Sequence, residues 1–131
     1  MREKTVEWAL KEKIIAIVRG MEAKDCLRVA QALYDGGIRL MEITYDQRDP
    51  AQGAKTDAIG KIAEAFEGRM LVGAGTVTTP ELVTRTRDAG GQFIISPDTN
   101  PAVIARTREL ELVSMPGAMT PSELLAAHAA G

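Results

Sequence analysis

Disulfide frameworks and metal centres need cysteine and histidine, and this sequence has one residue of each type. The single cysteine, Cys26, excludes a disulfide framework within the chain and is typical of the reducing cytoplasm. The single histidine, His128, has no cysteine pair to complete a ligand set, so we expect no metal site and no other cofactor. It also leaves Ser96 without the histidine partner that a serine nucleophile needs.

Long apolar runs and an excess of one charge are also lacking. No run of about 18 apolar residues is present, so the sequence predicts no membrane span. Residues 1–8 carry charges of both signs and no apolar segment, which is not the pattern of a signal peptide. Basic and acidic residues are interspersed for a net charge of −2, so there is no basic stripe and nucleic acid is not an expected partner. These absences favour a cytoplasmic protein.

The sequence does contain a repeated alternation of apolar, β-rich runs with helical patterns. This alternation predicts a single α/β domain over 1–131 with a parallel sheet, beginning with a helix over 1–12. The first apolar run is almost free of polar residues, so we expect that strand to be buried on both faces. The predicted strands are 14–18, 40–44, 70–73, 93–95 and 112–115, with helices over 23–34, 55–66 and 101–110 and capped helix starts within 78–81 and 120–123.

Chemically useful groups follow several of the predicted strands. They lie within 42–44, 73–77 and 115–117. Because the carboxyl ends of parallel strands share one rim of the sheet, active sites of α/β proteins collect there. The sequence therefore predicts a site on this rim. The longest and most polar loop of the rim, 45–53, fits either a mobile lid or a surface insertion, and the pattern favours the insertion.

Five stretches at the predicted strand ends resemble one enzyme family. They are similar, in order and spacing, to the aldolases of 2-keto-3-deoxy-6-phosphogluconate (KDPG) and 4-hydroxy-2-oxoglutarate (KHG). No single stretch is decisive, but five in order at consecutive strand ends make a strong match, from about Val6 to the last residue. The stretches are Lys13–Arg19, Gly36–Thr44, Val72–Val77, Gly91–Pro97 and Met115–Pro121.

The resemblance implies a (β/α)₈ TIM barrel of the class I aldolase type, which forms a lysine Schiff base with pyruvate and is usually a homotrimer. Such a barrel typically needs about 250 residues, so we expect only its first five βα units here, with strands six to eight absent. The family's lysine lies on strand six and its phosphate loops follow strands seven and eight. None of the six lysines in this sequence is predicted to lie on the rim.

The function implied for the complete chain is cleavage of KDPG, KHG or both to pyruvate and an aldehyde. The alternative is a catalytically inert, truncated or degenerate aldolase that lacks the Schiff-base lysine and acts at most as a carboxylate-binding scaffold. An epimerase of phosphorylated sugars on a similar barrel is a third, weaker possibility.

Glu42 is the candidate catalytic residue. It lies within an otherwise apolar predicted strand, where burial of a carboxylate costs several kcal/mol unless the group is partnered. By resemblance it is the general acid/base that moves protons during carbinolamine collapse and carbon–carbon cleavage. The structural alternative is a carboxylate that holds a loop amide.

The resemblance also implies a set of substrate-binding residues. Arg19 is expected to contact the substrate carboxylate through its planar fork of donors, or else to be a solvated arginine at a strand end. The glycine-rich turn after strand three allows a carboxylate to approach backbone amides, with a hydroxyl as a further donor. Two prolines are expected to line the pocket, or only to stiffen loops. The predicted set is Arg19, Gly75, Thr76, Pro97 and Pro116.

One departure from the family pattern concerns the substrate. In the best-known branch an arginine lies four residues after the catalytic glutamate, but here that residue is Asp46. Arg48 lies two residues further along and is a candidate for the same contact. The choice among 2-keto-3-deoxy sugar acids therefore stays open.

Overall fold

The computed structural model describes residues 2–131. Within this range no helix is both long and apolar enough to cross a membrane. Helices and strands alternate along the chain: α1 (Arg2–Glu12), β1 (Ile15–Val18), α2 (Ala23–Asp35), β2 (Leu40–Thr44), α3 (Gly53–Ala65), β3 (Leu71–Gly75), α4 (Pro80–Asp88), β4 (Phe93–Ser96), α5 (Pro101–Glu109), β5 (Val113–Pro116) and α6 (Pro121–Ala130).

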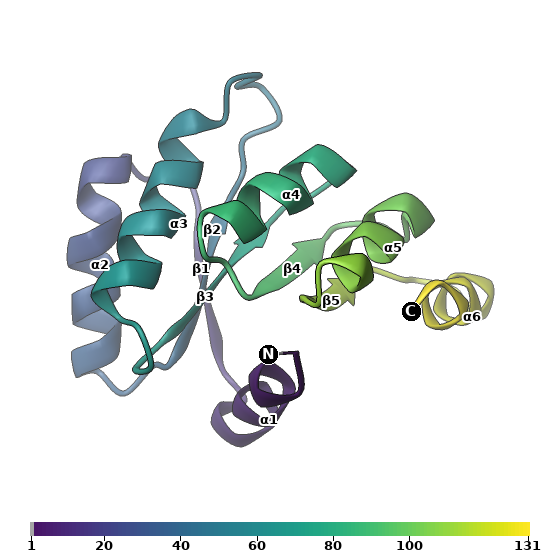
Figure 1. Cartoon of the computed structure of the whole chain (residues 1–131), viewed down its shortest axis with the longest axis horizontal. Helices are drawn as coiled ribbons and strands as arrows, with labels where there is room; N and C mark the ends of the chain where they lie inside the picture. The colour runs from purple at the N-terminus through teal and green to yellow at the C-terminus, as the bar shows by residue number, and fades with distance from the viewer. Residues whose placement is uncertain (1) are drawn as a thin grey trace.

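The five strands form one parallel sheet in the order β1-β2-β3-β4-β5. Helices α2 to α5 cover the same face of this sheet (Figure 1). A doubly wound sheet would reverse its strand order and carry helices on both faces, so the topology is that of consecutive units of a barrel. All the strand carboxyl ends consequently meet at one rim.

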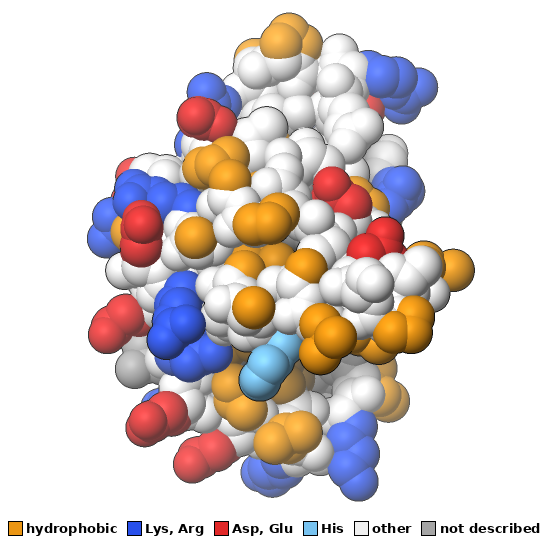
Figure 2. Space-filling model, turned by 90° about the vertical axis from the view of Figure 1, so that its right-hand side faces the viewer, with side chains coloured by type: hydrophobic (Ala, Val, Ile, Leu, Met, Phe, Trp, Pro, Cys, Tyr) orange, Lys and Arg blue, Asp and Glu red, His pale blue; other side chains and the backbone are white. Residues whose placement is uncertain are grey.

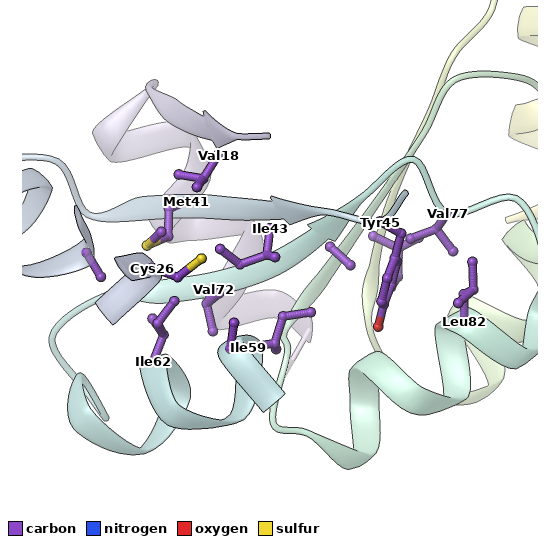
Figure 3. Packing of buried hydrophobic residues seen from close by; sticks show 14 of the residues in the cluster. Val18, Cys26, Met41, Ile43, Tyr45, Ile59, Ile62, Val72, Val77 and Leu82 are labelled. Carbon is purple, nitrogen blue, oxygen red and sulfur yellow. The ribbon is translucent and has the colours of Figure 1, made fainter. Parts of the chain in front are cut away.

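The face of the sheet toward the helices holds the main hydrophobic core. Met41, Ile43 and Val72 alternate along β2 and β3 toward this side and are almost fully buried. They meet Ile59 and Ile62 of α3, with Cys26 of α2 packed between (Figure 3). This packing fixes which residues of each strand face the other way, because side chains of a strand alternate between its two faces.

The opposite, inner face of the sheet carries a smaller cluster near the amino ends of the strands. Its buried members are Leu40, Leu71, Phe93 and Val113, and Trp8 of α1 packs against them. Helix α1 therefore covers the amino end of the inner face and leaves its carboxyl end for the site.

The prediction that the first strand is buried on both faces is wrong. Only Val18 of β1 is buried, while Ile17 is 68% exposed, and Ile14 lies outside the strand and is exposed. Strand β1 is an edge of the sheet and pairs only with β2 in the described chain. Helix α2 covers one of its faces, whereas Ile17 projects from the uncovered inner face.

The predicted helix starts are confirmed by their hydrogen bonds. The Thr79 hydroxyl accepts from the Leu82 N–H at 3.4 Å, and Pro80 takes the first helical position of α4. Thr120 and Glu123 form a reciprocal capping box at α6. Such caps satisfy amides that have no partner within the helix, so the sequence alone locates these boundaries.

Helix α6 lies at the periphery of the molecule and buries none of its residues. Figure 2 shows hydrophobic side chains gathered on this side of the protein. Met119, Leu124 and Leu125 are each more than half exposed.

Candidate active site

Glu42 is the middle residue of β2 and lies on the inner face of the sheet. Its β2 position pairs with Ile17 of β1 and Gly73 of β3, and its side chain alternates with those that face the helices. The residue is only 3% exposed. Its Oε1 accepts a hydrogen bond from the Thr44 hydroxyl at 3.4 Å, whereas Oε2 is buried without a hydrogen-bond partner among the described residues. Within residues 2–131 the carboxyl bonds the Thr44 hydroxyl and no loop amide, so the structural alternative for this residue is not seen there.

Gly75 makes room for the Glu42 carboxyl. A Cβ atom at position 75 would lie 2.3 Å from Oε1 and 2.6 Å from the carboxyl carbon. Real carbon atoms do not approach so closely, so a side chain at this position would displace the glutamate. The predicted role of Gly75 in substrate binding stays a prediction, but its contact with Glu42 is a feature of the structure.

The protein environment raises the pKa of Glu42. Burial is the main cause, because it disfavours the charged form. The hydrogen bond from Thr44 and the positive charge of Arg19 act in the opposite direction and only partly offset it. A raised pKa makes the carboxyl a better proton donor than an exposed glutamate would be at the same pH, which favours a role in general acid/base catalysis.

The raised pKa predicts how Glu42 affects stability with pH. Below the ordinary value of 4.5, the carboxyl is protonated in both the folded and the unfolded chain, so burial carries no charge penalty. As the pH rises through the folded-state pKa, the unfolded chain releases its proton more readily and stability falls. Glu42→Gln has no such charge to bury and avoids this loss of stability. The free energy of unfolding of the variant, minus that of the unaltered protein, should therefore be larger at pH 8 than at pH 4. Urea unfolding at both pH values measures the difference.

Glu67→Gln is the control for this pH experiment, because it removes an exposed carboxylate from the turn that follows α3. A stability difference between Glu42→Gln and the unaltered protein that is the same at pH 4 and pH 8 would contradict the prediction.

A cleft of about 550 Å³ opens on the rim at the ends of β1, β2 and β3. Arg19 and Thr76 both line it and contact each other, with the Arg19 Nη2 donating to the Thr76 hydroxyl at 3.4 Å. Thr44 lines the cleft as well and bonds Glu42, so it connects the cleft to the buried carboxyl. The structure thus brings together the predicted residues Arg19, Gly75 and Thr76 around Glu42.

Thr76 has a left-handed backbone conformation, with a φ of 57°. This region is unfavourable for a β-branched residue and is found mostly where the surrounding structure imposes it, often at functional sites. The strained turn directs the end of β3 into the cleft.

Pro97 and Pro116 lie apart from this cleft, at the ends of β4 and β5. The two loops that carry them are joined: the Gly117 N–H donates to the Ser96 carbonyl at 2.9 Å, and the Thr99 hydroxyl donates to the Gly117 carbonyl at 2.6 Å. Neither proline is among the cleft-lining residues of the described chain. The candidate site therefore has two parts, one on β1 to β3 and one on β4 and β5.

The polar loop after β2 is anchored at both ends. Tyr45 is buried against Val77 and Leu82 (Figure 3), and its hydroxyl lies 3.1 Å from that of Thr86. At the other end the Gln52 side chain bonds the backbone of Asp46. These contacts favour the fixed surface insertion over the mobile lid.

The prediction that no lysine lies on the rim is wrong for Lys55. Helix α3 begins at Gly53, so Lys55 lies in its first turn and lines the cleft. Its Nζ donates to the Met21 carbonyl at 2.5 Å. The sequence had a signal for this position, because the first turn of a helix that follows a parallel strand lies at the rim.

Comparisons with known proteins identify the family. A family model described as KDPG and KHG aldolase matches residues 6–131. The chain therefore belongs to the KDPG and KHG aldolase family. A probable 2-dehydro-3-deoxy-6-phosphogalactonate aldolase of Rhizobium meliloti is 39% identical over 122 residues, which are 93% of this chain and 55% of that protein.

Solved structures agree with this assignment. A native KDPGal structure superposes with a TM-score of 0.79 at 33% identity, over 89% of this chain and 54% of the other. The Legionella pneumophila KDPG aldolase with pyruvate captured as a covalent carbinolamine intermediate superposes with a TM-score of 0.77 at 32% identity, over the same shares of the two chains. These structures confirm the predicted fold class. The chain spans about half the length of the curated relatives that it matches.

Proposed function

We propose that the protein is a class I aldolase that cleaves a 4-hydroxy-2-oxo acid, KDPG, KHG or both, to pyruvate and an aldehyde. The observation that carries this proposal is the buried Glu42 carboxyl beside a polar cleft, in a chain of the KDPG and KHG aldolase family. The carbinolamine captured in the Legionella pneumophila relative supports Schiff-base chemistry with pyruvate.

In this proposal Glu42 moves the protons of the reaction. It donates a proton to the carbinolamine hydroxyl, which leaves as water, and its carboxylate then takes the proton of the substrate's C4 hydroxyl as the C3–C4 bond breaks. Its unpartnered Oε2 is free to accept that proton, and Thr44 holds Oε1 in place. The Schiff-base lysine is expected on a strand that follows these five.

The other predicted residues bind the substrate. Arg19 and Thr76, which contact each other in the cleft, offer a guanidinium and a hydroxyl to the carboxylate of the 2-oxo acid. Gly75 keeps the backbone of β3 close to the reacting carbon. Pro97 and Pro116 form the apolar wall at β4 and β5.

One observation favours the second candidate, a carboxylate-binding scaffold without catalysis. The cation that acts on the Glu42 carboxyl is Arg19, and Lys55 bonds the Met21 carbonyl. No lysine of the described chain is hydrogen-bonded to Glu42. Without a Schiff-base lysine, the rim would bind a 2-oxo acid but could not activate it.

A pyruvate-release assay on the natural gene product that carries this sequence tests the proposal. We expect turnover with KDPG, its galactonate epimer or KHG, and a stoichiometric adduct after borohydride reduction with pyruvate, seen by mass spectrometry. Absence of turnover with every 4-hydroxy-2-oxo acid would refute it. If the protein binds pyruvate non-covalently but shows neither turnover nor an adduct, it is the carboxylate-binding scaffold of the second candidate function.

The assembly and location are proposed with the function. A cytoplasmic homotrimer is expected for the complete protein, and light scattering of the purified gene product measures the stoichiometry. No nucleic acid or membrane partner is part of the proposal.

A further inference from the structure

The cation expected four residues after Glu42 is replaced here by a carboxylate. Asp46 lies at that position and lines the rim cleft. The sequence left open whether Arg48 takes over the contact with substrate.

Arg48 is already engaged by Asp46. Its Nε and Nη2 donate to the two carboxylate oxygens of Asp46, both at 3.0 Å, and its backbone N–H donates to the same group at 3.0 Å. These hydrogen bonds from Arg48 hold the pKa of Asp46 near 2, so the pair stays charged at neutral pH. The Arg48 side chain is 91% exposed, which places it at the mouth of the cleft.

Lys55 is in a different situation. It is half-buried, and its ammonium donates to a backbone carbonyl, that of Met21, in place of a carboxylate. An ammonium has three N–H donors, so two remain for a ligand. Within the described chain no carboxylate lies within ion-pairing distance of Lys55. The Asp46 carboxylate forms its ion pair with Arg48. Three cations (Arg19, Arg48 and Lys55) and two carboxylates (Glu22 and Asp46) line the cleft, which gives its lining a formal charge of +1.

We propose that Lys55 binds the carboxylate of the 2-oxo acid in this cleft, together with Arg19, and so takes the place of the cation missing at position 46. This inference rests on the proposed function and deepens it. A carboxylate fits better than a phosphate, because the cleft connects to Glu42 through Thr44. The group bound there must be close to the reacting carbons, and the carboxylate of a 2-oxo acid is attached directly to the carbonyl carbon. A phosphate ester lies at the far end of the substrate.

The test compares Lys55→Met with Lys61→Met in the natural gene product. Both variants remove one ammonium from α3, but Lys61 is exposed and lies outside the cleft. We expect Lys55→Met to raise KM for the 2-oxo acid about 10- to 100-fold with kcat changed much less, because a hydrogen bond to a charged group is lost. Lys61→Met should leave KM unchanged, and Lys55→Arg should restore most of the affinity.

Calorimetric titration with oxalate keeps this inference separate from the proposed function. Oxalate offers a carboxylate but no ketone, so its binding does not depend on Schiff-base formation. Weaker oxalate binding in Lys55→Met than in Lys61→Met supports the inference even if the gene product shows no aldolase turnover. Equal oxalate affinity in the two variants, no oxalate binding by the unaltered protein, or a fall in kcat with KM unchanged would overturn it.

Discussion

Replacing Glu42 by glutamine is expected to lower aldolase turnover by about 10²- to 10⁴-fold, the usual contribution of a positioned general acid/base. Glutamine has the same shape and can still accept the Thr44 hydrogen bond, so the fold should persist. What it lacks is a group that exchanges a proton. The loss should therefore fall on kcat, measured by pyruvate release from KDPG or KHG in the natural gene product.

The pH profile distinguishes catalysis from structure. In a plot of kcat against pH, the change in rate that follows the titration of Glu42 should be absent in Glu42→Gln and present in Glu67→Gln. A variant with full turnover would assign Glu42 to structure alone. A variant that has lost both turnover and its cooperative unfolding transition would show that the residue is needed for the fold.

Gly75→Ala should be damaging out of proportion to the one methyl group that it adds. The new Cβ would lie 2.3 Å from the Glu42 Oε1, and β2 and β3 are buried along their whole length, so neither strand can move aside. Overpacking of this kind costs about 1–3 kcal/mol. Because the displaced group is the proposed acid/base, turnover should fall with stability. Urea unfolding and the pyruvate-release assay measure the two effects.

Gly53→Ala is the matched control, because a Cβ at the start of α3 meets nothing within 4 Å. It should change stability by no more than about 1 kcal/mol, in the stabilising direction if at all. A double-mutant cycle adds a sharper test: in a Glu42→Ala background the carboxyl is gone, so Gly75→Ala should cost less. Equal costs in the two backgrounds would contradict the proposed contact between Gly75 and Glu42.

The alternation of strands and helices was predictable from the sequence because it depends on local features. Apolar runs mark β2 and β4, and threonine caps followed by proline mark the starts of α4 and α6. Glu42 stood out for a similar reason, since a carboxylate inside an apolar strand is costly wherever that strand is buried. The motifs at five strand ends likewise indicated the family without any contact being known.

Tertiary structure alone decided the contacts across the sheet. The register of β2 and β3 pairs Glu42 with Gly73, and the Glu42 side chain extends along the sheet to Gly75. No pattern in the sequence specifies which residues of two strands become neighbours. The exposed Ile17 follows from the place of β1 at an edge of the sheet, although its sequence is typical of a buried strand. Lys55 lies in the first turn of α3 whether the helix starts at 53 or 55, but its contact with the Met21 carbonyl depends on how α3 packs beside the chain after β1. Sequence periodicity determines the elements because each depends on its own residues, whereas the site depends on distances between elements that only packing sets.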